Sequence, residues 1–262
     1  MELCSIASGS SGNCVYVASA CTKILVDAGI SGKRIVDGLA SIDVDPSEIS
    51  GILITHEHSD HIQGVHVVAK KYNLDIYGTA KTLKYLFDSC KGNLGNGSLV
   101  EISPDCDFTI GDLRIHPFST SHDALDPVCY RIASEDKQVA VATDLGFYDD
   151  YILDNLTGLD GIYLESNHDK NILMVGHYPY NLKMRIAGNK GHLSNDDAAE
   201  LLKKIYSDKL KFALLAHLSK ENNYAELAYE TARAELAKVR NDCDDFCLSV
   251  AYRDIPSDVY RV

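Results

Sequence analysis

The sequence has 262 residues, of which 45% are hydrophobic and 24% are charged, and its formal net charge is −13. This composition is that of an ordinary globular protein with a buried core. The acidic balance argues against a protein that holds nucleic acid or an anionic membrane by net charge alone, although a bound dication can reverse the local field. No apolar run reaches the length of a membrane span and no signal peptide is visible at the N-terminus. The eight cysteines are scattered without a C-x-x-C motif, so we expect reduced thiols and a cytoplasmic protein.

Short runs of strand-forming residues alternate with helical patterns along the chain. In chain order, strands are expected at residues 3–7, 14–18, 23–26, 51–54, 75–77, 108–110, 113–118, 128–133, 138–142, 161–164, 211–216 and 246–250. Helices are expected at 31–39, 61–71, 80–87, 194–206 and 222–239, with Ser194 as a capping residue, and in the stretch 169–186 a helix that begins or bends at Pro179. No linker divides the chain, so we expect one domain over residues 1–262, of the α/β class, with helices packed outside sheets.

Several predicted strands end in residue types that bind metal ions. The strand at 51–54 leads into His56, His58, Asp60 and His61, and four other strands lead into Asp27, His122, Asp144 and His217. Imidazoles and carboxylates in this number are enough for two metal sites that share a carboxylate, and they suit zinc, manganese or iron. The lack of thiolate ligands argues against a closed structural zinc site. The alternative is a set of turn and cap residues in an α/β protein without a metal.

The segment from His56 to His61 resembles the H-x-H-x-D-H signature of the metallo-β-lactamase fold superfamily, and later motifs of that superfamily match in order. The resemblance implies a four-layer αββα sandwich, with two mixed β-sheets and helices on the outer faces. It implies that His56, His58 and His122 hold one metal ion. The second ion would be held by Asp60, His61 and His217, with Asp144 bridging the two. Asp27 would lie behind the ligands and orient the histidine loop, although a strand-end cap explains it nearly as well.

A dinuclear centre of this kind is suited to hydrolysis. Two cations about 3.5–4 Å apart lower the pKa of a bridging water to near neutrality and polarise the group under attack. We therefore expect two divalent ions, zinc or manganese with iron as a third candidate. Asp60 is expected to serve catalysis as well as metal binding.

His192 lies between a glycine-rich turn and the predicted helix that starts at Ser194. Backbone amides at a helix N-terminus favour an anion, and an imidazole beside them can bind a phosphate or protonate a leaving oxygen. The segments 191–194 and 216–219 resemble the tail of the tRNase Z-type nucleases, which implies a catalytic acid or phosphate contact at His192 rather than a metal ligand. The alternative is a solvent-exposed residue before a helix.

Longer segments look like one bacterial branch, the YycJ (WalJ) family of DNA-processing hydrolases. These segments are 8–13, 121–127, 165–169, 191–196 and 218–223. The resemblance implies a phosphodiesterase with 5′-to-3′ exonuclease activity on duplex DNA, which it would meet through the phosphates. Ser10, Asn13, Asn167 and His168 are candidate substrate contacts. A tight connection for the first pair and an Asx-turn for the second are the alternatives.

Two other functions stay open at this point. One is a small-molecule hydrolase on the same metal centre, such as a lactonase, a thioesterase or a cyclic-nucleotide phosphodiesterase. The other, ranked lower, is a non-catalytic metal-binding partner protein. Against a nuclease stand the acidic total and the lack of a helix-turn-helix or zinc-finger motif. Basic residues at 183, 185, 190, 203 and 204 suggest a phosphate track, but a solvated helix face is the commoner explanation. Protein partners are not identified by the sequence.

Overall fold

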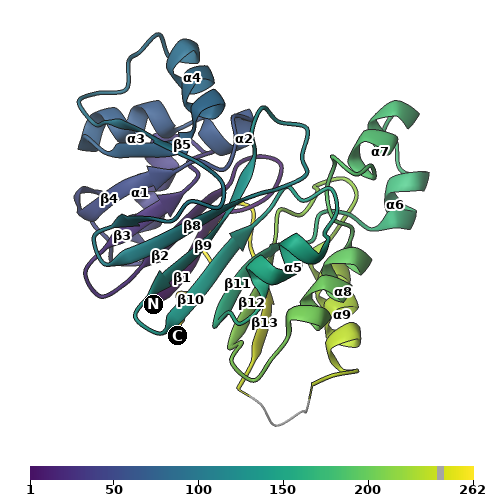
Figure 1. Ribbon diagram of the computed structural model, residues 1–262. Coiled ribbons are helices and arrows are strands. Elements are labelled where there is room, and N and C mark those ends of the chain that lie inside the picture. Colours follow the sequence, from purple (N-terminus) through teal and green to yellow (C-terminus); the bar gives the residue numbers. More distant parts are fainter. Residues whose placement is uncertain (241–244) are drawn as a thin grey trace.

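Figure 1 shows the chain as a computed structural model, which describes residues 1–240 and 245–262. Its strands form two seven-stranded sheets with the orders β14-β1-β2-β3-β4-β5-β6 and β13-β12-β11-β10-β9-β8-β7. The first sheet contains β1 (Glu2–Ala7), β2 (Cys14–Ala18), β3 (Lys23–Val26), β4 (Ile49–Leu53), β5 (Asp75–Thr79), β6 (Leu99–Ile102) and β14 (Tyr260–Arg261). The second contains β7 (Phe108–Ile110), β8 (Leu113–Ser119), β9 (Val128–Ser134), β10 (Lys137–Ala142), β11 (Gly161–Glu165), β12 (Phe212–Ala216) and β13 (Cys247–Val250).

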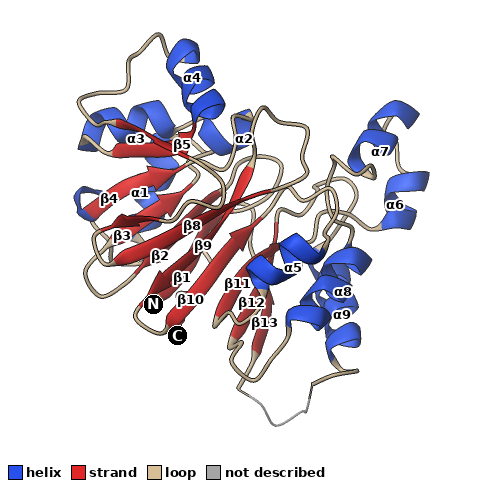
Figure 2. Cartoon of the chain, in the orientation of Figure 1, coloured by secondary structure: helices blue, strands red, loops and turns tan. Residues whose placement is uncertain are grey.

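Helices lie on the outer faces of both sheets, as Figure 2 shows in blue against red. Between the strands of the first sheet, the chain forms α1 (Gly32–Ala40), a short 3₁₀ helix (Pro46–Glu48), α2 (Ser59–Ile62), α3 (Val65–Tyr72) and α4 (Ala80–Ser89). The second sheet is covered by α5 (Asp150–Leu156), α8 (Asn195–Ile205) and α9 (Ala225–Leu236), while α6 (Lys170–Val175) and α7 (Tyr180–Ile186) lie apart from it (Figure 1). Each sheet mixes parallel and antiparallel pairs. The predicted αββα sandwich of two mixed sheets is confirmed.

Three apolar clusters explain these layers. The central cluster joins the two sheets, with Ile24 from β3 and Tyr130 and Val139 from the second sheet, all fully buried. A second cluster packs the first sheet against α1, α3 and α4, and a third packs the second sheet against α5, α8 and α9. The strands β3, β4, β10, β11 and β12 have the other sheet on one face and helices on the other. Their sequences are therefore nearly continuous apolar runs.

Most predicted elements are confirmed, with shifts of at most three residues at their ends. Ser194 caps α8 through its side chain, which accepts a hydrogen bond from the Asp197 amide, and α7 begins directly after Pro179. The strands β6 and β14, the helix α5 and the 3₁₀ helix at Pro46–Glu48 lie outside the predicted elements.

The single helix expected at 61–71 is wrong. The chain forms two helices there, because α2 ends at Ile62 and α3 begins at Val65. Gly64 lies at the break, where its amide donates to the Ala28 carbonyl over 2.7 Å. A Cβ at Gly64 would lie 2.1 Å from the Ile30 carbonyl oxygen. The loop after β3 therefore packs into the break, and this long-range contact has no signature in helical periodicity.

No helix within residues 1–240 and 245–262 is both long enough and apolar enough to cross a membrane.

Candidate metal centre

The predicted metal ligands lie at the carboxyl ends of strands from both sheets. Three non-glycine residues at these ends, Asp27, Asp144 and His217, have left-handed φ values of 60°, 61° and 56°. This conformation is uncommon for residues with a Cβ and persists where the surrounding structure enforces it, often at functional sites. The turn out of each strand sets the direction in which its first polar side chain points.

The histidine loop between β4 and α2 is fixed by hydrogen bonds to Asp27, at the end of β3. Asp27 Oδ1 accepts from the Thr55 amide over 2.9 Å, and Asp27 Oδ2 accepts from the Thr55 hydroxyl over 2.8 Å. Asp27 Oδ2 also lies 2.7 Å from His61 Nδ1. One buried carboxylate therefore fixes both the start of the loop and the orientation of an imidazole.

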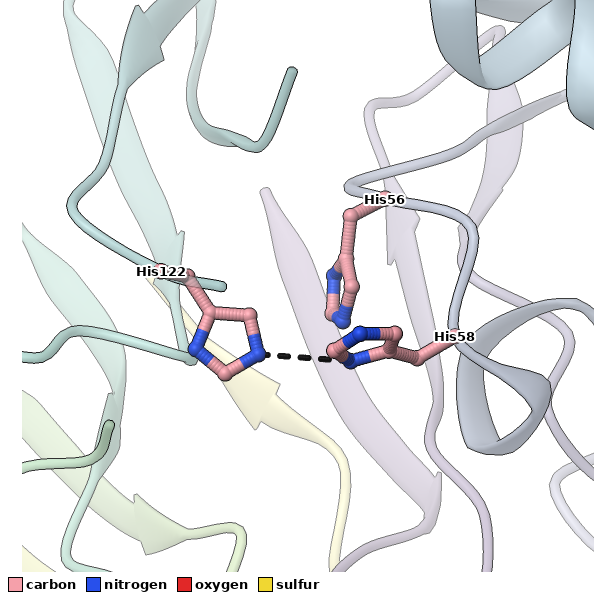
Figure 3. Close-up of side chains that lie close together, drawn as sticks. All are labelled: His56, His58 and His122. Atoms are coloured by element: carbon pink, nitrogen blue, oxygen red, sulfur yellow. Dashed lines mark hydrogen bonds between the residues drawn. The ribbon is translucent and has the colours of Figure 1, made fainter. Parts of the chain in front are cut away.

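Figure 3 shows the first group of candidate ligands, His56, His58 and His122, whose rings point toward one another. One nitrogen from each ring lies within 4.8 Å of the others. His122 Nε2 is 3.3 Å from His58 Nδ1. Two of these residues come from the loop after β4 and the third from the loop after β8, so the group joins the two sheets.

A second group contains Asp60, His61 and His217. Asp60 Oδ2 lies 3.6 Å from His61 Nε2 and 3.5 Å from His217 Nε2. Asp144 lies between the two groups, because its Oδ2 is 3.3 Å from His61 Nε2 and its Oδ1 is 3.6 Å from His122 Nε2. Asp144 Oδ1 is also 3.6 Å from His217 Nδ1, so this one carboxylate lies beside residues of both groups.

Hydrogen bonds at the outer side of three rings leave the inner nitrogens for the centre. Nδ1 of His61 faces Asp27, Nδ1 of His122 lies 3.0 Å from the Gly191 carbonyl oxygen, and Nδ1 of His217 lies 2.8 Å from Glu165 Oε1. A proton on each Nδ1 satisfies these acceptors, so each Nε2 is the nitrogen that would bind a metal ion once it carries no proton. Metal-binding histidines show this pattern of outer partners.

Several buried nitrogen and oxygen atoms at the centre of the cluster have no hydrogen-bond partner in the protein. Among the described residues, His56 Nε2, Asp144 Oδ2 and His217 Nε2 are buried and make no hydrogen bond. Leaving such atoms unsatisfied is costly, and native proteins do so rarely. Imidazole nitrogens and carboxylate oxygens that converge in this way fit a divalent metal ion.

The charges in the cluster influence one another strongly. Burial lowers the pKa of His61, but the carboxylates of Asp27, Asp144 and Asp60 outweigh burial and raise it to about 9. Burial would raise the pKa of Asp60, but His61 and His217 outweigh it and hold that pKa below its usual range. Burial lowers the pKa of His56, and its histidine neighbours add to the effect. Without a metal, protons on His61 and His217 offset the buried acids, and a bound cation would take over this role.

Glu165, the last residue of β11, belongs to the site but is not among the candidate site residues predicted from the sequence. It is fully buried, and its Oε1 lies 2.8 Å from Nδ1 of both His192 and His217. Its Oε2 accepts from the amides of Leu145 and Leu193 over 2.9 and 3.1 Å. Potential ligand atoms of Glu165, Asp144, His192 and His217 lie within 4.8 Å of one another, but the Glu165 oxygens already have hydrogen-bond partners, so an orienting role fits better. The signal was present, because Glu165 is a strand-end acid like Asp27.

His192 lies at the edge of the cluster. Its ring centroid is 5.0 Å from that of His122 and 5.2 Å from that of His217, and 21% of its side chain is exposed. Because Glu165 binds Nδ1, Nε2 is the nitrogen left to face a substrate. The ring is therefore close to the candidate ligands and still open to solvent.

The four candidate substrate contacts differ in exposure. Ser10 is exposed, but Asn13 is buried, where its Oδ1 accepts from the Gly9 amide and its Nδ2 lies 3.2 Å from His61 Nε2. Asn167 and His168 are also buried, and Asn167 Nδ2 donates to the His217 carbonyl over 2.8 Å. The burial of these three favours the tight-connection and turn interpretations over direct substrate contact.

The fold and the cluster together define a metallohydrolase of the beta-lactamase type. The family model of the beta-lactamase superfamily domain matches residues 22–217. The chain is 43% identical over 234 residues to the exodeoxyribonuclease WalJ of Streptococcus pneumoniae serotype 2, covering 89% of this chain and 87% of that protein. It is 39% identical over 223 residues to the exodeoxyribonuclease YycJ of Bacillus anthracis, covering 85% and 84%. The chain therefore belongs to the beta-lactamase superfamily and, within it, to the family of WalJ and YycJ.

Solved structures of low sequence identity share the fold. Zn²⁺-bound PqqB from Methylobacterium extorquens superimposes with a TM-score of 0.73 at 13% identity, covering 98% of this chain and 100% of that one. The short form of human tRNase Z gives a TM-score of 0.65 at 14% identity, with full coverage of both chains. These likenesses support the four-layer architecture.

Proposed function

We propose that this protein is a metal-dependent exodeoxyribonuclease that hydrolyses DNA in the 5′-to-3′ direction. The observation that carries the proposal is the buried His/Asp cluster with unpartnered atoms at its centre, in a chain 43% identical to a protein named as an exodeoxyribonuclease. A non-catalytic relative would be expected to lack some of these ligands, and each expected position is filled.

The metal assignment is part of the proposal. His56, His58 and His122 would hold one divalent ion, and Asp60, His61 and His217 a second, with Asp144 shared between them. Asp144 lies beside His122 of the first group and beside His61 and His217 of the second, which supports the shared role. Zinc and manganese are the ions that this set of ligands suits best, with iron as a third candidate.

Divalent ions bound at these residues would supply Lewis-acid activation of a water molecule and of the phosphoryl oxygens. Within the chain, Asp60 would orient the attacking water as well as bind metal. When water attacks phosphorus and the bond to the leaving oxygen breaks, His192 Nε2 would give that oxygen its proton. Glu165 supports this role, since its contact with Nδ1 orients the ring and leaves Nε2 to face the substrate. Asp27 would act by orienting His61.

DNA would be recognised mainly through phosphates at this centre, because the net charge of −13 offers no general attraction. We also propose a cytoplasmic location, in line with the free cysteines in the described part of the chain.

The proposal is tested with duplex DNA labelled at the 5′ end in one sample and at the 3′ end in another, with Mn²⁺ or Zn²⁺. We expect the wild type to release 5′ label first, and Asp60→Ala to lose at least about 100-fold in rate. Asp136→Ala is a matched control, because Asp136 is an exposed aspartate whose side chain is 82% accessible. It should behave as the wild type.

Metal content measured on the same samples separates two failures. If the wild type binds metal but releases no label from DNA, the nuclease assignment is wrong and small phosphodiesters and lactones become the substrates to test. If it binds no metal, the cluster assignment is wrong.

A further inference from the structure

A pocket of about 410 Å³ opens beside the candidate metal centre and shares His122 with it. Its wall is formed by the loop after β8, by Phe147 in the loop after β10, by the start of α5, and by Lys190. These are the same loops that carry His122, Asp144 and His192. Any group that occupies the pocket is therefore next to the reacting phosphate of the proposed reaction.

Phe147 offers an unoccupied aromatic face there. Its side chain is 41% exposed, and within residues 1–240 and 245–262 no aromatic ring or cation is stacked on it. Its backbone is held firmly, because the neighbouring Gly146 donates to the Ser121 carbonyl over 2.7 Å. A Cβ at Gly146 would lie 2.2 Å from the Asn189 carbonyl oxygen, so the loop is packed against the segment that leads to His192.

The second aromatic residue of the pocket is already in use. The Tyr151 hydroxyl donates to Asp105 over 2.7 Å and accepts from the Ser119 amide over 3.0 Å. Tyr151 thus forms a fixed wall, and Phe147 is left as a platform for an incoming flat group.

Lys190 differs from the other four basic residues of this region. Lys183 donates to the Met174 carbonyl, Arg185 pairs with Asp123, Lys203 pairs with Glu235, and Lys204 contacts Tyr148 and Glu200. No hydrogen bond or ion pair engages Lys190 Nζ in the part of the chain that the structure describes. A continuous phosphate track is therefore not formed, and one lysine remains available at the pocket.

The pocket also has acidic residues, which limit what it can hold. Asp149 and Asp126 line it, and Asp149 accepts from the Ile152 amide over 3.1 Å as the cap of α5. Several consecutive phosphates of a DNA backbone would be repelled by these carboxylates. A single phosphate that pairs with Lys190 avoids most of this repulsion. An aromatic face, one free cation and an adjacent hydrolytic centre together match one nucleotide.

We propose that this pocket is a nucleotide subsite of the proposed exodeoxyribonuclease. A nucleobase next to the scissile phosphate stacks on Phe147, and a neighbouring phosphate pairs with Lys190. This inference rests on the proposed function and narrows its substrate to DNA ends, because a base inside a duplex has both faces covered by its neighbours. The ring stacks on any base, so the subsite confers no sequence preference.

The first test compares Phe147→Leu, Phe147→Tyr and the wild type on a DNA oligonucleotide. Stacking of a base on an aromatic ring contributes about 1–3 kcal/mol, so Phe147→Leu should raise KM about tenfold while Phe147→Tyr stays near the wild type. Phe87→Leu is the matched control, because Phe87 is 49% exposed on α4, outside the pocket. It should leave KM unchanged.

The second arm uses the same oligonucleotide with an abasic residue at the terminal or the penultimate position. When the abasic residue replaces the base that stacks, the KM of the wild type should rise about tenfold, and the KM of Phe147→Leu should not rise further. An equal loss in both proteins at each position would overturn the stacking role. If the wild type hydrolyses none of the oligonucleotides, the proposed function itself fails, which is a distinct result.

Lys190 is tested by salt dependence. Lys190→Gln should reduce the slope of log KM against log salt concentration by about 0.7, the value for one contact to single-stranded DNA. Lys33→Gln, at an exposed lysine of α1, should leave the slope unchanged. An unchanged slope in Lys190→Gln would overturn the phosphate contact.

Discussion

At the scale of single residues, one carboxylate holds two histidines with different proposed tasks. Glu165 binds His217, a candidate metal ligand, and His192, the candidate acid, through the same oxygen. Burial would raise the pKa of Glu165, but the two histidines outweigh it and keep the carboxylate ionised. A residue in this position can couple metal binding to proton transfer, since a change at one ring alters the hydrogen bond to the other.

We therefore expect Glu165→Gln to lower DNA hydrolysis about 10- to 100-fold, because an uncharged amide cannot stabilise both rings in their required states. The measurement is kcat at saturating metal, together with the metal content of the purified protein. Asp160→Asn is the matched control. Asp160 is buried just before β11, where it pairs with Lys137 and Lys209 far along the strand from the cluster. Equal losses of kcat in the two variants would contradict the positioning role.

His168 gives a prediction for stability against pH. Burial lowers its pKa from 6.5 to about 4, and its Nδ1 has no hydrogen-bond partner among the described residues. The unfolded chain takes up a proton on this residue near pH 6.5, while the folded chain does not until about pH 4. The contribution of neutral His168 to the free energy of unfolding is therefore fully present above pH 6.5. It is lost as the pH falls toward 4, and the loss is about 3 kcal/mol at most.

In a chelator, so that metal release does not contribute, the wild type should lose stability between pH 7 and pH 4 more steeply than His168→Gln. Urea unfolding at several pH values measures the two slopes. His177→Gln, at an exposed histidine between α6 and α7, should keep the slope of the wild type. Parallel curves for the wild type and His168→Gln would show that His168 is protonated equally in both states.

At the scale of elements, strand ends carry the site, and this is why much of it was visible in the sequence. Buried parallel strands are short apolar runs, and the polar residue that follows each run marks the edge where side chains converge. The candidate ligands were found in this way, while the distances between them required the structure. Glu165 shows the limit, because it follows the predicted strand at 161–164 as the other candidates follow theirs, but its contacts with His192 and His217 are visible only in the structure.

The strands β14 and β6, which were not predicted, lack a strong local signal. β14 has two residues and exists because Tyr260 and Arg261 pair with Leu3 and Glu2 at the opposite end of the chain. β6 has one buried residue among its four, so its apolar pattern is weak. The break between α2 and α3 depends on backbone contacts from the loop after β3. Such long-range contacts override helical periodicity, and a single sequence does not reveal them.

The close packing of this loop against α2 leads to a prediction. A Cβ at Gly29 would lie 1.6 Å from the Asp60 carbonyl oxygen, so Gly29→Ala must displace the backbone that carries Asp60 and His61. We expect about a 100-fold lower kcat/KM, because displacement of about 1 Å at a reacting centre has effects of this size. Gly78→Ala is the control, since its nearest contact is the Leu83 side chain at 3.3 Å. Normal activity in Gly29→Ala would contradict the packing argument.

At the scale of the whole molecule, the candidate metal centre joins the two sheets. His56, His58, Asp60 and His61 come from the half built on the first sheet, and His122, Asp144 and His217 come from the second. Between the sheets most of the contact is apolar, through the central cluster, with a few buried hydrogen bonds such as that from the Tyr130 hydroxyl to the Ile54 carbonyl. Metal ions bound across this boundary would act as cross-links in addition to supplying chemistry, so catalysis and global stability are linked through one cluster.

Removal of metal should therefore lower the melting temperature of the entire chain. A ligand that binds only the folded state at about 1,000 times its Kd adds about 4 kcal/mol, which corresponds to a shift of about 10 °C for a chain of this size. Calorimetry with and without a chelator measures the shift. Asp60→Ala should show a smaller shift, because it loses a ligand of the second ion while the group of His56, His58 and His122 stays complete. An equal shift in both proteins would mean that the second ion does not contribute to stability, and no shift in the wild type would mean that the centre does not link the sheets.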